Sequence, residues 1–317
     1  MKQYDYSGKR YFLHFYHTKE RIEMNDEMIK RRRLHRRGVF CIISAAFFFS
    51  LMSLFVKLSG NIPSVEKSFF RNLVAIVFAF AIIKKEGIPM RSGGSKNTLI
   101  LTGRAVGGTI GIFCNFYAVD HLVIADANMM NKLSPFFAIL FSFFLLKEKV
   151  KPYQLLAVIA AFTGAMFILK PGQGIVSFPA LIGMIGGMGA GFAYANVRLA
   201  SERGVPGPFI VFFFSVFSCL AAVPVMLPVI KAVTIRQLML LLGAGLAATG
   251  GQFSVTAAYS AAPAREISVY DYTQILFSAM MGYLFLGEIP DGSSLIGYVI
   301  IIAAGVYMFF AQRRAEK

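Results

Sequence analysis

Two ionisable residues lie inside apolar stretches that are long enough to cross a bilayer. Lys132 falls within residues 122–146 and Asp271 within residues 264–287. A charge within hydrocarbon is costly, so such a residue usually has a function and an opposite charge as its partner. The lysine could bind a carboxylate of a small solute, and the aspartate could bind its amine or a coupling proton. The alternative interpretation is a charge pair that only holds two helices together.

The depth of these two residues allows a direct ion pair without requiring one. Lys132 lies slightly outward of the centre of its stretch and Asp271 slightly inward of its own. Their offset is about six residues, which at ~1.5 Å per residue corresponds to roughly 9 Å along the membrane normal. A lysine side chain spans much of that distance.

Further polar residues share these two stretches. On each stretch they fall within a ~100° arc of a helical wheel, so each set would form one polar face of a helix. The residues on these faces are Asn128, Asn131, Lys132 and Pro135 on the first stretch and Tyr270, Asp271, Gln274 and Ser278 on the second; Tyr272, beside them, is a further binding candidate. If the two faces meet, they form a polar site inside an otherwise apolar protein.

Two arginines and several other polar residues complete the candidate set. Arg71 and Arg104 each lie one or two turns inside a predicted span, on opposite sides of the membrane. They could snorkel to the interface or tether helices, or they could form an entrance that attracts anions. Residues two apart lie ~200° apart around a helix, so only one of each neighbouring pair should face a site. The remaining candidates are Asn115, Tyr117, Tyr194, Asn196 and Gln252.

Four acidic residues lie at the ends of predicted spans. Asp126 and Glu266 fall in first helical turns, where a carboxylate complements the helix dipole. Glu148 and Glu288 stand beside loops and are expected to tether those boundaries. None of the four needs a role in binding.

The composition indicates an all-α integral membrane protein. The 317 residues are 56% hydrophobic and 15% charged, against about 25% charged residues in soluble domains. Apolar runs close to the ~20 residues that a membrane helix needs recur along the chain. They predict ten transmembrane helices at residues 39–58, 66–83, 98–118, 122–146, 152–170, 179–197, 208–230, 237–258, 264–287 and 292–311.

Basic residues predict the orientation in the membrane. The net charge of +16 would suggest nucleic acid in a soluble protein, but here Lys and Arg gather in loops and in residues 1–37. Ten spans place both termini on one side, and the loops of that side carry most of the basic residues. By the positive-inside rule both termini are cytoplasmic and the protein lies in the cytoplasmic membrane, in contact with lipid. No cleavable signal peptide is visible before Gly38.

The chain contains an internal repeat with an offset of 140 residues. Residues 135–148 and 275–288 are both apolar and both end in a glutamate. The predicted organisation is a basic cytoplasmic tail (1–37), a first five-helix repeat (38–171), a second (172–312) and a cytoplasmic C-terminus (313–317). Five is odd, so the second copy is inverted relative to the first. In proteins of this design the substrate site lies where the two copies meet.

Glycines recur at every fourth position in three predicted spans. The sets are Gly103, Gly107 and Gly111; Gly183, Gly187 and Gly191; and Gly243 and Gly251 with Ala247 between them. Such stripes let neighbouring helices pack closely, and they could also let helix faces slide during transport.

Several segments resemble the EamA branch of the drug/metabolite transporter superfamily. They are Arg71-Asn-Leu-Val, Arg104 to Tyr117, Ala125 to Leu146 with Pro135 inside, Glu148, the helix around Gly164, Tyr272 to Phe277 and Leu286 to Pro290. The resemblance covers residues 38–312 and implies ten helices around a central cavity, with substrate exchange that needs no ATP. Family members carry amino acids, nucleobases, vitamins, S-adenosylmethionine or drugs. The second copy has Ile275 in place of Pro135, so a proline kink is not expected in the ninth span.

We therefore expect a secondary active transporter, with export favoured, of a small organic metabolite such as an amino acid. A coupling proton could accompany the cargo. One alternative is a larger aromatic cargo such as a vitamin, S-adenosylmethionine or a drug, which the segment from Tyr272 to Gln274 slightly favours. The other is a non-transporting membrane protein that acts through its basic tail. The sequence has no phosphate-binding loop and no metal-ligand spacing, so no enzyme activity, cofactor, metal or nucleic-acid partner is expected.

Overall fold

A computed structural model describes residues 7–145, 151–169, 177–230, 232–261 and 268–315. Every regular element within these ranges is helical. The first half contains α1 (Ser7–Leu58), α2 (Ser64–Glu86), α3 (Ser95–His121), α4 (Ile124–Asn131), α5 (Ser134–Leu145) and α6 (Pro152–Leu169). The second half contains α7 (Phe178–Glu202), α8 (Gly207–Met226), α9 (Ile235–Ala261), the 3-10 helix η1 (Ser268–Tyr272), α11 (Thr273–Leu286) and α12 (Gly292–Ala315).

Ten membrane-length segments emerge from the described helices, as the apolar runs predict. Seven helices are long and apolar enough to cross a bilayer on their own. The helix α2 is long enough but carries charged residues at both ends and Arg71 inside. The other two segments are interrupted: α4 and α5 form the fourth, and η1 and α11 form the ninth.

The interruption of the fourth segment follows from Pro135. Proline lacks a backbone N–H and its ring clashes with the carbonyl four residues earlier, which here belongs to Asn131, the last residue of α4. The ninth segment has no proline at the matching position, and no proline kink forms there. Instead it changes from 3-10 to α-helix between Tyr272 and Thr273. By the 140-residue offset, this change of helix type corresponds to the break at Lys132 and Leu133 in the fourth segment.

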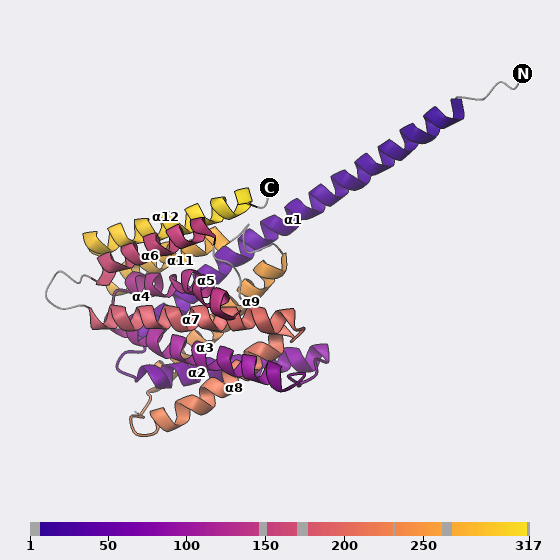
Figure 1. Ribbon diagram of the computed structural model, residues 1–317. Coiled ribbons are helices and arrows are strands. Elements are labelled where there is room, and N and C mark those ends of the chain that lie inside the picture. The colour runs from indigo at the N-terminus through magenta and orange to yellow at the C-terminus, as the bar shows by residue number, and fades with distance from the viewer. Residues whose placement is uncertain (1–6, 146–150, 170–176, 231, 262–267, 316–317) are drawn as a thin grey trace, which may run out of the picture.

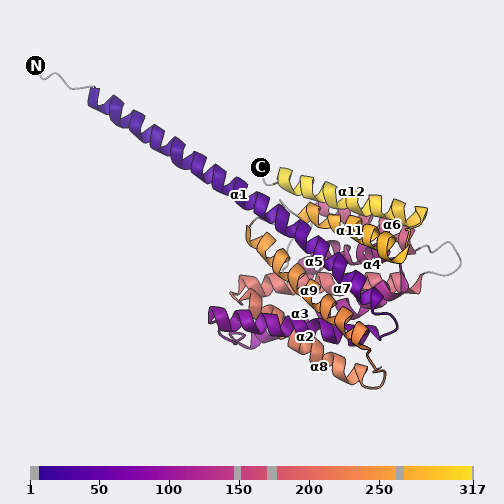
Figure 2. The same cartoon turned by 180° about the vertical axis from the view of Figure 1, so that it is seen from behind.

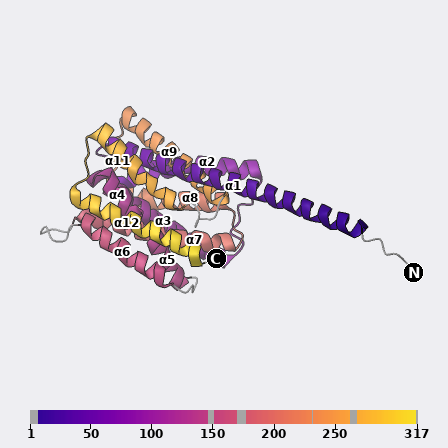
Figure 3. The ribbon, with the colours of Figure 1, turned by 90° about the horizontal axis from the view of Figure 1, so that it is seen from above.

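The helix packing has the symmetry of an inverted repeat. By the 140-residue offset, α9 is the counterpart of α3 and α7 is the counterpart of α1. The helix α3 packs on α7, and correspondingly α9 packs on α1. In the same way α5 packs on α7 and α11 on α1, while α2 with α8 and α6 with α12 are pairs of counterparts. Figure 3 shows α6 and α12 side by side at one edge of the bundle. These contacts all join one half of the chain to the other, so the two repeats form one body.

Glycines bring the helix backbones into contact at the crossing of α3 and α7. A Cβ added to Gly189 would lie 2.8 Å from the carbonyl oxygen of Gly107, and one added to Gly111 would lie 3.1 Å from the Ala190 nitrogen. The predicted stripe on α7 has a different partner, because a Cβ added to Gly187 would lie 2.5 Å from the Met130 carbonyl oxygen. Two glycine faces of α7 therefore pack against α3 and against the interrupted fourth segment.

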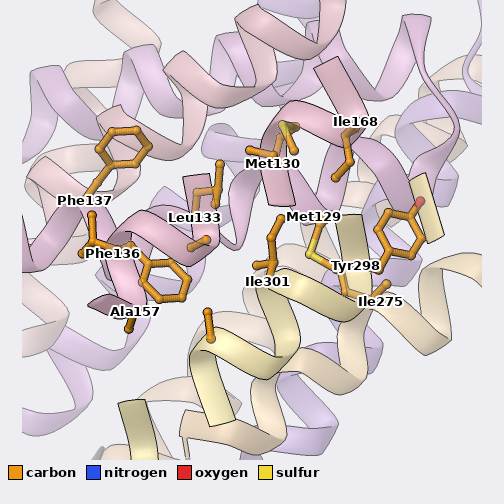
Figure 4. Packing of buried hydrophobic residues seen from close by; sticks show 14 of the residues in the cluster. Met129, Met130, Leu133, Phe136, Phe137, Ala157, Ile168, Ile275, Tyr298 and Ile301 are labelled. Carbon is orange, nitrogen blue, oxygen red and sulfur yellow. The ribbon is translucent and has the colours of Figure 1, made fainter. Parts of the chain in front are cut away.

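The largest group of buried apolar residues fastens the two interrupted segments to α6 and α12. It includes Met129, Leu133 and Phe136 from α4 and α5, Ile275 from α11, and Ile301 from α12 (Figure 4). This packing fixes the two breaks relative to each other, so the residues at the breaks are held in place.

The first helix is far longer than a membrane span. Its 52 residues correspond to roughly 78 Å, and its N-terminal part leaves the bundle (Figures 1 and 2). Residues 7–37 of the basic tail therefore continue the first membrane helix. The end of α12 lies near the place where α1 leaves the bundle, so both chain ends lie at the same end of the molecule.

Candidate substrate-binding site

An ion pair joins the two interrupted segments. The Lys132 Nζ lies 2.5 Å from the Asp271 Oδ2, and the two side chains are 10% and 24% exposed. Lys132 follows the last residue of α4, and Asp271 belongs to the 3-10 helix. The lysine side chain can span much of the expected offset, and its Nζ contacts the carboxylate directly.

The second oxygen of Asp271 has no hydrogen-bond partner although it is buried. Beside it, the ring of Tyr272 packs on Gly305 of α12, where an added Cβ would lie 2.5 Å from the tyrosine hydroxyl. Gly305 thus makes room for Tyr272 next to the ion pair. A buried carboxylate oxygen without a donor could accept a proton or the amine of a bound solute.

Asn128 belongs to a buried polar network, in which its side-chain amide both accepts and donates a hydrogen bond. The Ser53 hydroxyl donates to the Asn128 Oδ1 (3.1 Å), and the Asn128 Nδ2 donates to the Ser278 hydroxyl (2.8 Å). The Ser50 hydroxyl lies 3.0 Å from the Ser278 hydroxyl and donates to the Gln274 carbonyl oxygen at 3.0 Å. This network connects α1, α4 and α11 and holds Asn128 in place.

Arg71 and Arg104, which are predicted to lie on opposite sides of the membrane, direct their side chains to one aromatic ring. The Arg104 guanidinium carbon lies 3.8 Å from the centre of the Phe214 ring on α8, and that of Arg71 lies 6.0 Å from it. Both arginines are only 8% exposed, so neither snorkels to an interface. The helices α2 and α3 run antiparallel, and each arginine lies deep enough for its long side chain to reach the middle of the bundle.

Tyr194 connects the arginines with the ion pair. Its hydroxyl interacts electrostatically with Asp271, Arg104 and Arg71, yet its side chain is 53% exposed. Tyr194 therefore borders unfilled space next to groups that are otherwise buried. Among the described residues of this region, Lys132, Arg71 and Arg104 are cationic and Asp271 is anionic.

The other predicted residues take different positions. Asn115 is buried with its side-chain oxygen unpaired, whereas Tyr117 stacks on His121 at the end of α3, 4.1 Å between ring centres. Asn196 donates to the Phe192 carbonyl oxygen and lies against Gly103. Tyr270 is exposed, and Asn131 and Gln252 are half-buried on α4 and α9; these three are not tied to the ion pair by any described contact.

Polar contacts close the end of the bundle opposite the chain termini. Lys57 forms an ion pair with Glu288 and donates to the Leu122 carbonyl oxygen, while Glu288 accepts from the Ile124 N–H at 2.9 Å. Glu288 therefore ties α1 to the start of α4, in agreement with a tethering role. Asp126 accepts a 2.6 Å hydrogen bond from the Tyr298 hydroxyl of α12. Glu148 and Glu266 lie outside the described residues.

Some relevant residues gave no signal in the sequence. Lys67 pairs with Asp120 at 2.5 Å near the same closed end, although neither residue lies deep in an apolar run. Phe214 is one of 32 phenylalanines, and nothing in its neighbourhood distinguishes it from the others. A hollow of about 530 Å³ over Met90–Gly94 is formed by one exposed loop, so it is no candidate for a site between the repeats.

The model of the EamA-like transporter family matches residues 36–170 and again residues 181–311. The chain belongs to the EamA-like transporter family. The two matches correspond to the two predicted repeats, and membership of the family makes the chain a multi-pass membrane transporter of the drug/metabolite transporter superfamily rather than an enzyme. A small-molecule substrate is therefore implied.

Two characterised relatives and one solved structure are similar along most of their length. The pseudopaline exporter CntI of Pseudomonas aeruginosa is 33% identical over 276 residues, which cover 86% of this chain and 95% of the relative. A riboflavin transporter of Rhizobium johnstonii is 27% identical, covering 88% and 93%. One crystal structure superposes with a TM-score of 0.61 at 16% identity, covering 88% of this chain and 99% of the other, and it supports the fold alone.

Proposed function

We propose that this protein is a secondary active exporter of a small, amino-acid-like metabolite, and that Lys132 and Asp271 bind the cargo. The observation that carries the proposal is the direct ion pair between the two interrupted segments. Each partner offers a charge complementary to one end of an amino acid, because the lysine suits a carboxylate and the aspartate suits an amine. Both residues lie at breaks in the helices, where transporters commonly form their sites.

The proposed binding step exchanges one ion pair for two. In the empty protein Lys132 and Asp271 neutralise each other, which keeps two charges tolerable inside the bundle. A bound zwitterion would insert its carboxylate at Lys132 and its amine at Asp271, so that both charges stay paired. The exchange separates α4 from η1, and the movement of these two segments would couple binding to a change of access.

The direction of transport is proposed from the named relative and from the charge distribution. The relative with 33% identity carries the name of an exporter. By the positive-inside rule we expect both chain ends in the cytoplasm, and the polar contacts of Lys57 and Glu288 would then join the helices at the outer end of the bundle. The described conformation is therefore one that would receive cargo from the cytoplasm.

A larger aromatic cargo is the second candidate. Relatives named riboflavin transporters match most of the chain, and the exposed rings of Tyr194 and Tyr270 could stack on an aromatic group. In this case Tyr194 would contribute more to binding than Asp271.

Transport into inverted membrane vesicles tests both candidates. Vesicles from cells that express the chain should accumulate pseudopaline in the presence of a proton gradient, above vesicles without it, and riboflavin serves as the second substrate. The variants Lys132→Met and Asp271→Asn should lose at least about tenfold in rate, because each removes one charge that binds cargo. The exposed Lys96→Met variant is the control and should keep the wild-type rate.

Unchanged transport by both variants, at equal amounts of protein in the membrane, would contradict the role of the ion pair. Riboflavin transport without pseudopaline transport would instead favour the aromatic cargo.

A further inference from the structure

We propose that Arg71, Arg104 and Phe214 form a second binding site, which takes an additional carboxylate of the cargo. The cargo would then be an amino-acid-like compound with at least two carboxylates. This inference rests on the proposed function, because it extends the same binding site from α4 and η1 to α2, α3 and α8.

The two guanidinium groups share one face of the bundle interior. They come from different helices, yet they lie 3.8 Å and 6.0 Å from the centre of the same Phe214 ring. They are also close enough to repel each other electrostatically. Two cations side by side in a buried position are stable only if something compensates their charge.

No described residue supplies that compensation. Neither arginine forms an ion pair with a described carboxylate, and the Nε atoms of both are buried without a hydrogen-bond partner. Arg71 donates from Nη1 to the Asn72 Oδ1 at 2.8 Å, which uses one of its five donors. A carboxylate accepts well from arginine because its two oxygens match the planar guanidinium fork.

The surroundings hold the arginines in place. A Cβ on Gly108 would lie 2.2 Å from the Arg104 Nη1 and 2.8 Å from the Phe214 ring, so the glycine leaves room for the guanidinium beside the ring. Asn72, which orients Arg71, donates in turn to the Ser218 hydroxyl of α8 at 2.9 Å. A buried guanidinium whose Nε–H has no partner is prepared for a ligand.

The site is connected with the ion pair through Tyr194. Tyr194 lies in the neighbourhood of both arginines and of Asp271, and its side chain is exposed. One cargo molecule that contacts Tyr194 could thus place an amine at Asp271, one carboxylate at Lys132 and another at the arginines. Three cations and one anion of the protein would then face two anions and one cation of the cargo.

Thermal unfolding of the full-length protein in lipid nanodiscs tests the proposal with matched probes. Aspartate, glutamate and 2-aminoadipate carry a second carboxylate, whereas asparagine and glutamine carry an amide in its place. At equal ionic strength the acids should raise the Tm by a few degrees more than the amides do, because a ligand that binds the folded state more tightly stabilises it more. This difference should vanish in Arg71→Gln and Arg104→Gln, and persist in the exposed control Arg203→Gln.

The unliganded variants provide a second measurement. If the arginines await an anion, Arg71→Gln and Arg104→Gln relieve uncompensated charge and should unfold at the same or a higher temperature than the wild type without ligand. If the arginines only hold the fold together, both variants should unfold at a lower temperature. The proposal would be overturned if aspartate, glutamate and 2-aminoadipate do not stabilise the wild type. It would also be overturned if they stabilise Arg71→Gln and Arg104→Gln as much as the wild type. Because the readout is binding alone, it is independent of whether pseudopaline is exported.

Discussion

Buried charges in this protein fall into two kinds, and the difference lies in their partners. Lys132 and Asp271 compensate each other directly, whereas Arg71 and Arg104 share an aromatic ring and have no described carboxylate. A buried pair contributes little net stability, but the loss of one partner leaves an uncompensated charge. The pair is thus suited to open only when a charged cargo replaces each partner.

Stability measurements on single and double variants should show that the charges of Lys132 and Asp271 depend on each other. Lys132→Met and Asp271→Asn should each destabilise the protein by about 1–3 kcal/mol, less than the ~3–5 kcal/mol of a fully buried pair, because Asp271 is partly exposed. The double variant should be more stable than either single variant, since no unpaired charge remains, yet it should not transport. A double variant as unstable as the sum of the two single changes would show that the residues are not coupled.

The sequence singled out both partners of the ion pair and allowed their contact, but it did not indicate where the arginine side chains point. An ionisable residue inside an apolar run is visible in the sequence, so Lys132 and Asp271 could be singled out. The depth of Arg71 and Arg104 along their helices was also visible, but the direction in which a long flexible side chain points depends on the neighbouring helix. That neighbour contributes Phe214, and no sequence pattern marks it.

At the scale of the helices, the architecture around the candidate site depends on the interrupted segments and on the close helix crossings. Pro135 explains why α4 ends at Asn131, and it could be read from the sequence. The 3-10 helix from Ser268 to Tyr272 could not, because the ninth segment reaches a similar break without a proline. The glycine stripes correctly indicated close packing, but periodicity alone does not tell which helix approaches which stripe.

The crossing of α3 and α7 should be sensitive to one methyl group. In Gly189→Ala the new Cβ would lie 2.8 Å from the Gly107 carbonyl oxygen and 3.0 Å from the Gly111 nitrogen. Because backbone faces backbone here, the helices must move apart, and the change should destabilise the protein by about 1–3 kcal/mol. Gly207→Ala is the matched control, since an added Cβ there meets nothing within 4 Å. Equal unfolding temperatures for the two variants would contradict the close crossing.

At the scale of the whole molecule, the two repeats depend on each other for their packing. The main helix contacts join one half of the chain to the other and repeat under exchange of the halves. This arrangement follows from the duplicated sequence with an odd number of spans, so the fold class and the ten segments could be predicted. The helical extension of α1 could not be foreseen, because the basic tail has no apolar periodicity that would mark a helix.

The orientation of the halves places the candidate site between them. Lys57 and Glu288 close one end of the bundle, whereas Tyr194 is exposed among the buried charges. The central claim is therefore that water and cargo reach Tyr194 from the end that carries the chain termini. A lipid-filled or solid interior would leave no path to the ion pair.

Thiol labelling at position 194 tests this claim most directly. Tyr194→Cys is introduced after Cys41, Cys114 and Cys219 are replaced by serine, and a charged thiol reagent that cannot cross membranes is applied to inverted vesicles. The new cysteine should react, and the transported substrate should slow that reaction. Val299→Cys, which is 68% exposed on α12 at the edge of the bundle, should stay unmodified because it faces lipid. A cysteine at position 194 that remains unreactive from both sides of the membrane would contradict the account.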